Sequence, residues 1–171
     1  YRLCRAVEWD QHLDAQRTFA VDFTGQAPFV RNTHFGALKV KDAVVDFFKD
    51  AHGERPSVAK QRPDVQLNAH LNKGQFTLYL DLSGESLHRR GYRLDGGLAP
   101  LKENLAAAIL IRAGWPAIAK QGGALLDPMC GSATLLIEGA MMAADMAPGL
   151  ERDYFGFDGW LGHVPSMWRR L

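Results

Sequence analysis

The sequence has no long apolar run, few cysteines and almost no net charge, and each absence excludes a class of protein. No apolar run approaches the roughly 20 residues that a helix needs to cross a bilayer, so we expect no membrane partner. The 171 residues include two cysteines, which form no disulfide framework and favour a reducing, cytoplasmic location. The formal net charge is +1, so a nucleic-acid surface requires an uneven distribution of charges.

Other missing patterns narrow the chemistry. The first residue is Tyr1 and not Met, and we expect an interior cut there and not a signal peptide. The chain lacks a Walker lysine pattern, and its six histidines and two cysteines lack zinc-ligand spacing, so we expect no metal site. The apolar fraction of 47% is normal for a globular chain, whose length allows one or two domains.

Hydrophobic patterns in the first half predict an α+β domain. A helix with one apolar face is expected to begin at a cap, Asn32 or Thr33, and to end at Gly53. Asn72-Lys73-Gly74 is a hairpin turn signal between two alternating segments. The strands are expected at residues 18–24, 65–71 and 76–82.

The composition changes at Gly96-Gly97, which predicts a boundary between a domain at residues 1–95 and a domain at residues 96–171. The second domain shows helical spacing on both sides of a short apolar run. Its expected elements are a helix from about Pro100 to Gly114, a strand at residues 124–127 and a helix from about Ala133 to Met146.

The most informative segment is a predicted strand–loop–helix unit, whose loop is Asp127-Pro128-Met129-Cys130-Gly131-Ser132. Gly131 has no side chain, so a ligand can approach the backbone closely. The amides of the loop and of the first helical turn carry partial positive charge, which suits a carboxylate. Asp127 lies where open α/β sheets bind ligands, and it suits an ammonium or hydroxyl group better than a phosphate. The loop therefore favours S-adenosylmethionine (SAM) over ATP, the alternative being a plain turn that Asp127 caps.

Three separate sets of motifs resemble one family and occur along the chain in the order that this family has. The sequence Asp-Pro-Met-Cys-Gly-Ser-Ala-Thr-Leu-Leu-Ile-Glu, residues 127–138, resembles the first cofactor motif of amino-methylating nucleic-acid methyltransferases. Residues 100–108 resemble the preceding helix of the same enzymes. Segments that resemble a THUMP RNA-binding domain lie at residues 30–32, 35–43, 80–84 and 88–93. The combination is similar to bacterial 23S rRNA guanine-N2 methyltransferases, which join a THUMP domain to a Rossmann-like domain.

The resemblance implies an α/β fold. An N-terminally truncated α+β THUMP domain at residues 1–95 is expected to precede the first part of a Rossmann-like SAM-dependent methyltransferase domain at residues 96–171. The family usually has Gly where this chain has Ala133. Ala costs about 1 kcal/mol if that backbone needs a positive φ, and is favourable if the position lies inside the helix. The implied cofactor-binding residues are Asp127, Pro128, Cys130, Gly131, Ser132, Thr134, Lys102 and Glu103.

Basic residues in the THUMP-like segments predict two basic surfaces for RNA, the second of them formed by Arg89, Arg90 and Arg93. Arg and Lys beside Asn32, His88 and Tyr92 suit phosphate contact and base stacking, the alternative for each residue being an ordinary solvated face. The expected RNA-binding residues are Arg31, Asn32, Lys39, Lys41, Arg89, Arg90 and Arg93.

The family's catalytic motif, Asn-Pro-Pro-Tyr or a close variant, is missing, because no Pro-Pro pair occurs in the chain. We therefore expect a truncated chain without catalytic residues, which binds SAM weakly and does not methylate RNA by itself. The whole enzyme is expected to methylate the exocyclic N2 amine of a guanine in 23S rRNA or its precursor. Two alternatives remain: a DNA or RNA adenine-N6 methyltransferase, and a non-catalytic RNA-binding module with a vestigial cofactor loop.

Overall fold

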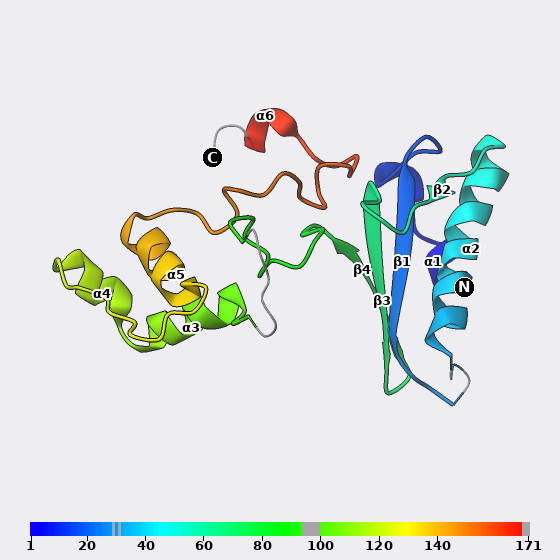
Figure 1. Cartoon of the computed structure of the whole chain (residues 1–171). Coiled ribbons are helices and arrows are strands. Elements are labelled where there is room, and N and C mark those ends of the chain that lie inside the picture. Colours follow the sequence, from blue (N-terminus) through cyan, green and yellow to red (C-terminus); the bar gives the residue numbers. More distant parts are fainter. Residues whose placement is uncertain (29, 31, 94–99, 169–171) are drawn as a thin grey trace. The chain divides into compact units, whose positions relative to one another are not determined.

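The structure, a computed structural model, describes residues 1–28, 30, 32–93 and 100–168. The chain divides into two compact units (Figure 1). Unit 1 comprises Tyr1–Gly84 with Tyr154–Leu171, and unit 2 comprises Glu85–Asp153. The predicted boundary at Gly96-Gly97 lies outside the described residues, so the division at residues 95 and 96 stays a prediction. None of the described helices combines the length and the apolar character that a membrane span requires.

Unit 1 is built on a four-stranded sheet with the order β2-β1-β3-β4 (Figure 1). β1 pairs in parallel with β2 and β3, and β3 pairs antiparallel with β4. The three predicted strands are confirmed, whereas the two-residue strand β2 is too short to produce a pattern. The strands are β1 (Thr18–Gly25), β2 (Ser57–Val58), β3 (Val65–Asn72) and β4 (Gln75–Asp81).

The hairpin between β3 and β4 turns on two residues, as its sequence predicts. Asn72 pairs with Gln75, and the intervening Lys73 and Gly74 have φ values of 48° and 79°. Two positive φ angles match the twist of the flanking strands, and glycine adopts the second without strain. The turn therefore sets the register that places Val65, Leu67 and the other buried side chains of β3 on one face.

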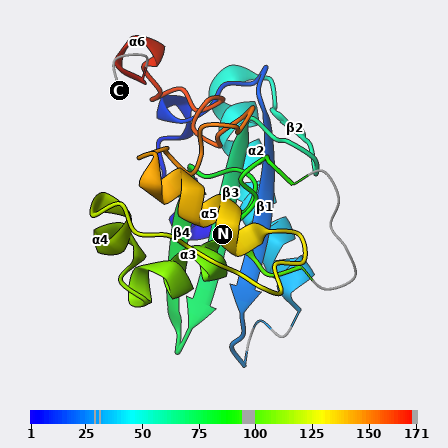
Figure 2. The same cartoon turned by 60° about the vertical axis from the view of Figure 1, so that its left-hand side comes forward.

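Helix α2 (Thr33–His52) covers one face of this sheet (Figures 1 and 2). The Asn32 side chain accepts hydrogen bonds from the backbone N–H groups of His34 and Phe35, at 2.9 and 3.3 Å. Asn32 and not Thr33 is therefore the cap, and Gly53 ends the helix in a left-handed conformation as predicted. The buried face of α2 joins the strands in one apolar core, whose members include Val40, Val44, Phe48, Phe19, Val65 and Leu67.

Two short helices at the beginning of the chain, α1 (Arg2–Arg5) and η1 (Trp9–Gln11), close this core. The buried Trp9 indole N–H donates to the Cys4 carbonyl at 2.7 Å. Burial raises the pKa of the Cys4 thiol, so Cys4 is suited to packing and not to reaction.

The last part of the chain belongs to the same unit and ends in α6 (Pro165–Trp168). Arg17 Nε donates to the Gly159 carbonyl at 2.9 Å, and the Tyr154 hydroxyl donates to the Pro63 carbonyl at 3.0 Å. These contacts join residues 91 to 142 positions apart, which no local sequence pattern reports.

Among its described residues, unit 2 contains three helices, α3 (Glu103–Arg112), α4 (Trp115–Lys120) and α5 (Thr134–Ala143) (Figure 2). The two predicted helices, from about Pro100 to Gly114 and from about Ala133 to Met146, are present as the shorter α3 and α5. Gly114 separates α3 from α4, and Pro116 lies in the first turn of α4, where a missing N–H costs nothing. The Trp115 indole N–H donates to the Gly139 carbonyl at 2.8 Å and so joins α4 to α5.

The predicted strand at residues 124–127 is wrong: the structure has no strand there. A strand requires a neighbour that accepts and donates its backbone hydrogen bonds. The described residues 85–93 and 100–153 contain no strand that serves as this neighbour. Leu126, which belongs to the apolar run, has 86% of its surface exposed.

Candidate cofactor site

The loop at residues 127–133 leads directly into the N-terminus of α5. Asp127 Oδ1 accepts a hydrogen bond from the Met129 N–H at 3.0 Å, and the Ala133 N–H donates to the Cys130 carbonyl at 2.7 Å. These short-range bonds fold the loop into two consecutive turns. A Cβ atom added at Gly131 would meet nothing within 4 Å, so the loop backbone is open to a ligand at that position.

Ala133 lies immediately before α5 with a φ of 56°, in the left-handed region. This is the strained alternative that the sequence left open, and the conformation costs an L-residue about 1–2 kcal/mol. Ala133 offers no side-chain acceptor, so no side chain caps the first-turn amides of α5. Uncapped amides at a helix N-terminus favour a negatively charged ligand group.

The predicted cofactor residues differ in exposure. Four of them lie at the surface of the loop, and Asp127 is half-buried beside them. Thr134 and Glu103 are buried, whereas Lys102 is exposed at the start of α3. The four exposed loop residues are Pro128, Cys130, Gly131 and Ser132. The structure thus brings the loop residues together in the sequence-predicted place, and Glu103 faces inward.

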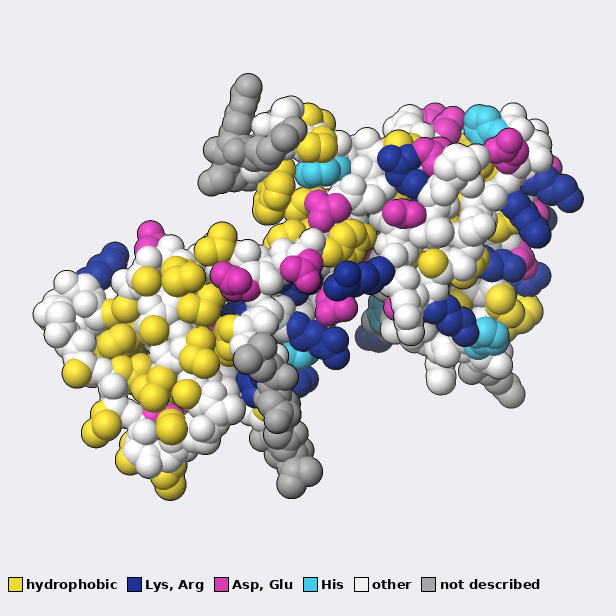
Figure 3. All heavy atoms as spheres, turned by 45° about the horizontal axis from the view of Figure 1, so that its top comes forward, with side chains coloured by type: hydrophobic (Ala, Val, Ile, Leu, Met, Phe, Trp, Pro, Cys, Tyr) yellow, Lys and Arg dark blue, Asp and Glu magenta, His cyan; other side chains and the backbone are white. Residues whose placement is uncertain are grey.

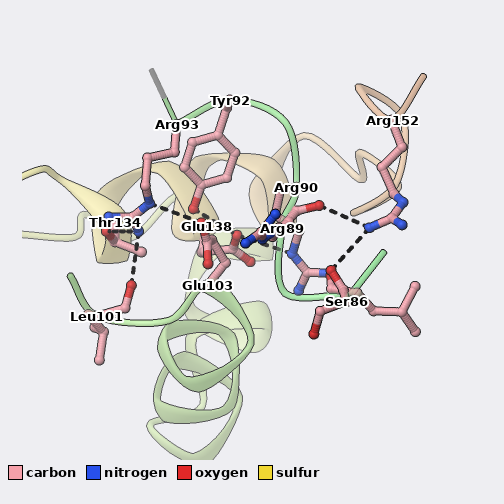
Figure 4. A network of polar contacts seen from close by, with 11 residues as sticks. Ser86, Arg89, Arg90, Tyr92, Arg93, Leu101, Glu103, Thr134, Glu138 and Arg152 are labelled. Carbon is pink, nitrogen blue, oxygen red and sulfur yellow. Dashed lines mark hydrogen bonds and ion pairs between the residues drawn. The ribbon is translucent and has the colours of Figure 1, made fainter. Parts of the chain in front are cut away.

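Arg93 connects the loop to α3 (Figure 4). Its Nε donates to Glu103 Oε1 at 3.0 Å, and its Nη2 donates to Thr134 Oγ1 at 3.0 Å and to the Leu101 carbonyl at 2.9 Å. Its Nη1 reaches Ser132 Oγ at 3.4 Å. Glu103 therefore faces the loop through Arg93, with its carboxylate satisfied by the guanidinium.

Glu138 on α5 forms a second buried centre (Figure 4). The Tyr92 hydroxyl donates to Glu138 Oε1 at 3.0 Å, and Arg90 Nε lies 3.4 Å from the same oxygen. Burial, the hydrogen bond to Glu138 and the negative charges of Glu138 and Glu103 raise the pKa of Tyr92 well above its usual value. Tyr92 and Arg90 therefore tie residues 90–93 to α5.

Residues 85–89 are held in place from the end of unit 2. The Arg152 guanidinium donates to the backbone carbonyls of Glu85, Ser86 and Arg89 at 2.8–3.2 Å (Figure 4). The Arg89 side chain is itself 68% exposed and lies 3.5 Å from a Glu85 carboxylate oxygen. Of the three arginines in unit 2 that the sequence predicts to bind RNA, Arg89 is the one whose side chain is exposed to solvent.

The other predicted RNA residues have varied surroundings. Arg90 and Arg93 face buried carboxylates, which favours a structural role for both. Lys39 lies over the Phe35 ring at 5.4 Å, Lys41 pairs with Asp42 at 2.8 Å, and Asn32 caps α2. Arg31 lies outside the described residues. The RNA-binding assignments stay predictions, and the exposed basic side chains among them are Lys39 and Arg89.

Sequence reasoning considered the half-buried Tyr92 for base stacking and gave the buried Glu138 no role, so it did not pair the two. One signal was available: Glu138 is the charged residue in the apolar helix Thr134–Ala143, and a buried carboxylate requires a partner. In the part of the chain that the structure describes, no group of three or more His, Cys, Asp and Glu residues is placed to hold a metal ion.

Two family models match this chain, one on each side of residue 85. Residues 1–81 match the THUMP domain, and residues 90–170 match the family described as RMKL-like, methyltransferase domain. The chain thus matches a THUMP domain first and the methyltransferase domain of the RMKL-like family second. The predicted recognition and the α/β class are confirmed.

Curated relatives match this chain along its whole length. The chain is 63% identical over its full length to the ribosomal RNA large subunit methyltransferase K/L of Pseudomonas aeruginosa and 62% identical to that of Stutzerimonas stutzeri. It spans 24% of the length of these relatives.

Solved structures show the same fold. A predicted N6-adenine-specific DNA methylase from Listeria monocytogenes is 28% identical, with a TM-score of 0.82 over 99% of this chain and 43% of its own. A putative methyltransferase, SMU.472, complexed with SAH is also 28% identical, with a TM-score of 0.80 over 98% of this chain and 43% of its own.

Proposed function

We propose that this chain is the RNA-binding and cofactor-loop part of an enzyme that methylates the exocyclic N2 amine of a guanine in 23S rRNA or its precursor. Its relatives at 62–63% identity are named as large-subunit rRNA methyltransferases. We propose a cytoplasmic location, because the relatives named as rRNA methyltransferases are bacterial. The observation that carries the proposal is the open loop at residues 127–133, joined to the uncapped N-terminus of α5.

The residues present fit SAM. The half-buried Asp127 carboxylate suits an ammonium or hydroxyl group, and the first-turn amides of α5 suit a carboxylate. Gly131 leaves room for close approach to the backbone. When bound, SAM supplies the methyl group. Pro128, Cys130, Ser132 and Thr134 complete the loop that holds it, and Lys102 lies at the start of the neighbouring helix.

Binding of S-adenosylhomocysteine (SAH), measured by isothermal titration calorimetry, tests this site. We expect Asp127→Asn to weaken binding at least tenfold, because the substitution removes the charge and keeps the shape. Asp145→Asn, an exposed aspartate just after α5, is the matched control and leaves the affinity unchanged. Equal loss in both variants, or no SAH binding by any form of the protein, would exclude the site.

Nucleoside analysis of the methylated product tests the substrate. A protein of the full length of the curated relatives that carries these residues is incubated with 23S rRNA and SAM. We expect N2-methylguanine in the digested RNA. A second function has one observation in its favour, because one structural neighbour is titled as an adenine-specific DNA methylase. N6-methyladenine in either nucleic acid would support that alternative, and no product with either would support a binding module.

Two separate RNA contacts are proposed, one by the exposed Lys39 of unit 1 and one by the exposed Arg89 of unit 2. A side chain that contacts a phosphate releases counterions on binding, so its removal weakens binding and lowers the salt dependence by about one ion. We expect this of Arg89→Ala, measured by fluorescence anisotropy at several salt concentrations. Lys120→Ala, a basic residue in the last turn of α4, is the control and leaves the salt slope unchanged.

A further inference from the structure

The two turns of the loop at residues 127–133 leave the side chains of Ser132 and Thr134, on either side of Ala133, free to bond to groups outside the loop. Gly131 and Ala133 both have positive φ angles, and only a glycine adopts that region without strain. A strained residue persists when its surroundings determine its conformation. The backbone bond from Ala133 to the Cys130 carbonyl supplies one part of that constraint, and contacts from outside the loop supply another.

Arg93 provides contacts on both sides of the strained residue. Its guanidinium reaches Ser132 Oγ at 3.4 Å and Thr134 Oγ1 at 3.0 Å, the hydroxyls that flank Ala133. These two hydroxyls are also 3.2 Å apart, within hydrogen-bond distance of each other. One side chain thus holds the loop at the point where the backbone is least favourable.

Arg93 is itself fixed at the start of α3. It donates to the Glu103 carboxylate at 3.0 Å and to the Leu101 carbonyl at 2.9 Å. The Arg93 and Glu103 side chains are 16% and 6% exposed, so water screens their attraction little. The guanidinium therefore links the segment before α3, α3 itself and the loop.

We propose that Arg93 is a positioning residue for the cofactor: it holds Ser132, Ala133 and Thr134 in the conformation that binds SAM. The inference rests on the proposed function, in which this loop holds SAM. Arg93 acts through the loop and not by contact with the reacting atoms. The segment before α3, which resembles part of a THUMP domain in sequence, is thereby a component of the cofactor site.

The geometry requires arginine. A guanidinium presents five donors in a planar fork, whereas a lysine ammonium is a point charge on a flexible stem. Arg93→Lys keeps the charge beside Glu103 but cannot reach Leu101, Ser132 and Thr134 together. The variant therefore separates the ion pair from the positioning of the loop.

Calorimetric titration with SAH tests the proposal, in a protein of the full length of the curated relatives. We expect Arg93→Ala to weaken SAH binding at least thirtyfold and Arg93→Lys about tenfold. Arg112→Ala is the matched control, because it removes an exposed arginine from the last turn of α3. It leaves SAH affinity unchanged.

A double-mutant cycle locates the path of the effect. Glu103→Gln weakens the attachment of Arg93, so its effect on SAH affinity is small when Arg93 is already Ala. Strict additivity of the two changes would overturn the linkage through Glu103. SAH affinity equal to wild type in both Arg93→Ala and Arg93→Lys would overturn the proposal as a whole.

Hydrogen exchange of the ligand-free protein separates this proposal from the proposed function. In Arg93→Ala we expect the amides of residues 131–134 to exchange at least tenfold faster, while those of α4 stay unchanged. If wild type does not bind SAH, the proposed function fails, and faster exchange at residues 131–134 still supports Arg93 as the group that holds the loop. Unchanged exchange at these amides overturns that role.

Discussion

Each of the two units of this chain is stabilised internally by a different kind of interaction. Unit 1 has a closed apolar core between α2 and the sheet, in which Phe19, Val44 and Phe48 are fully buried. In unit 2 the described residues contain far fewer buried apolar side chains: Ala106, Leu110 and Trp115. Buried carboxylates are instead prominent there, since Glu103 and Glu138 each face an arginine. Unit 1 depends mainly on apolar burial, and unit 2 depends strongly on ion pairs.

Unit 2, which buries few apolar side chains, exposes others on its surface. Apolar side chains gather over one side of it (Figure 3). The exposed large hydrophobic residues of unit 2 include Leu105, Ile109, Ile111, Ile118, Leu126 and Met129. An apolar patch of this kind is unusual on a monomeric domain and is typical of an interaction surface. Because these side chains are already exposed, the loss of one of them should lower the stability of unit 2 less than the loss of one buried ion pair.

The largest expected effect breaks the core of unit 1. Phe48→Ala removes a fully buried ring and leaves a cavity, so we expect a loss of about 3–5 kcal/mol in the free energy of unfolding of unit 1. Denaturant titration followed by circular dichroism measures it. Phe35→Ala, an exposed phenylalanine on the same helix, is the control with a loss below about 1 kcal/mol. Similar losses in both would remove the distinction between core and surface.

A second variant breaks the ion pairs of unit 2. Glu138→Ala leaves the buried Arg90 guanidinium and the Tyr92 hydroxyl without their carboxylate, and we expect unit 2 to lose about 2–3 kcal/mol. Hydrogen exchange of the α5 amides detects it. Glu85→Ala removes the partner of the exposed Arg89 and costs less than about 1 kcal/mol. A negligible effect of Glu138→Ala would contradict the dependence of unit 2 on its ion pairs.

The strained position in unit 2 gives a smaller change of opposite sign. Ala133→Gly relieves a left-handed alanine, so we expect a gain of about 1 kcal/mol in the stability of unit 2. Ala108→Gly, in the exposed part of α3, is the matched substitution in a regular helix and costs about 0.5–1 kcal/mol. Thermal denaturation distinguishes the two signs, and a loss at both positions would show that position 133 does not need the left-handed conformation.

The smallest effect concerns alkaline pH. The pKa of Tyr92 is raised in the folded protein, so the unfolded chain loses this proton first as the pH rises. The stabilisation is complete below the unfolded value of about 10 and decreases as the pH increases above it. We expect the stability difference between wild type and Tyr92→Phe to shrink from pH 8 to pH 11. A constant difference over this range would show that burial and the hydrogen bond to Glu138 do not raise the pKa of Tyr92.

Most of unit 1 was predictable because its signals are local. Alternation of apolar residues predicted β1, β3 and β4, the Lys73-Gly74 turn predicted the hairpin, and Asn32 and Gly53 predicted the ends of α2. The short elements α1, η1 and β2 were missed, since two to four residues show no periodicity. The attachment of residues 154–168 to unit 1 was also missed, because its partners lie far away in the sequence.

Unit 2 was less predictable for the same physical reason. Residues 124–127 have the composition of a buried strand, but composition cannot supply the neighbouring strand on which pairing depends. Arg90 and Arg93 have the composition of an RNA surface, but their carboxylate partners on α5 and α3 lie 48 and 10 residues further along the chain. A sequence pattern shows that a charge is present and cannot show which charge it faces.

The sequence by itself determined the family, the type and order of the main helices and strands, and the position of the cofactor loop, because these depend on periodicity, caps and short motifs within a few residues. Only the tertiary structure decided that Ala133 is left-handed, that Glu103 and Glu138 are buried, and that Arg93 joins the loop to α3. These properties depend on side chains that are distant in the chain and meet only after folding, where burial makes the pairing of charges obligatory.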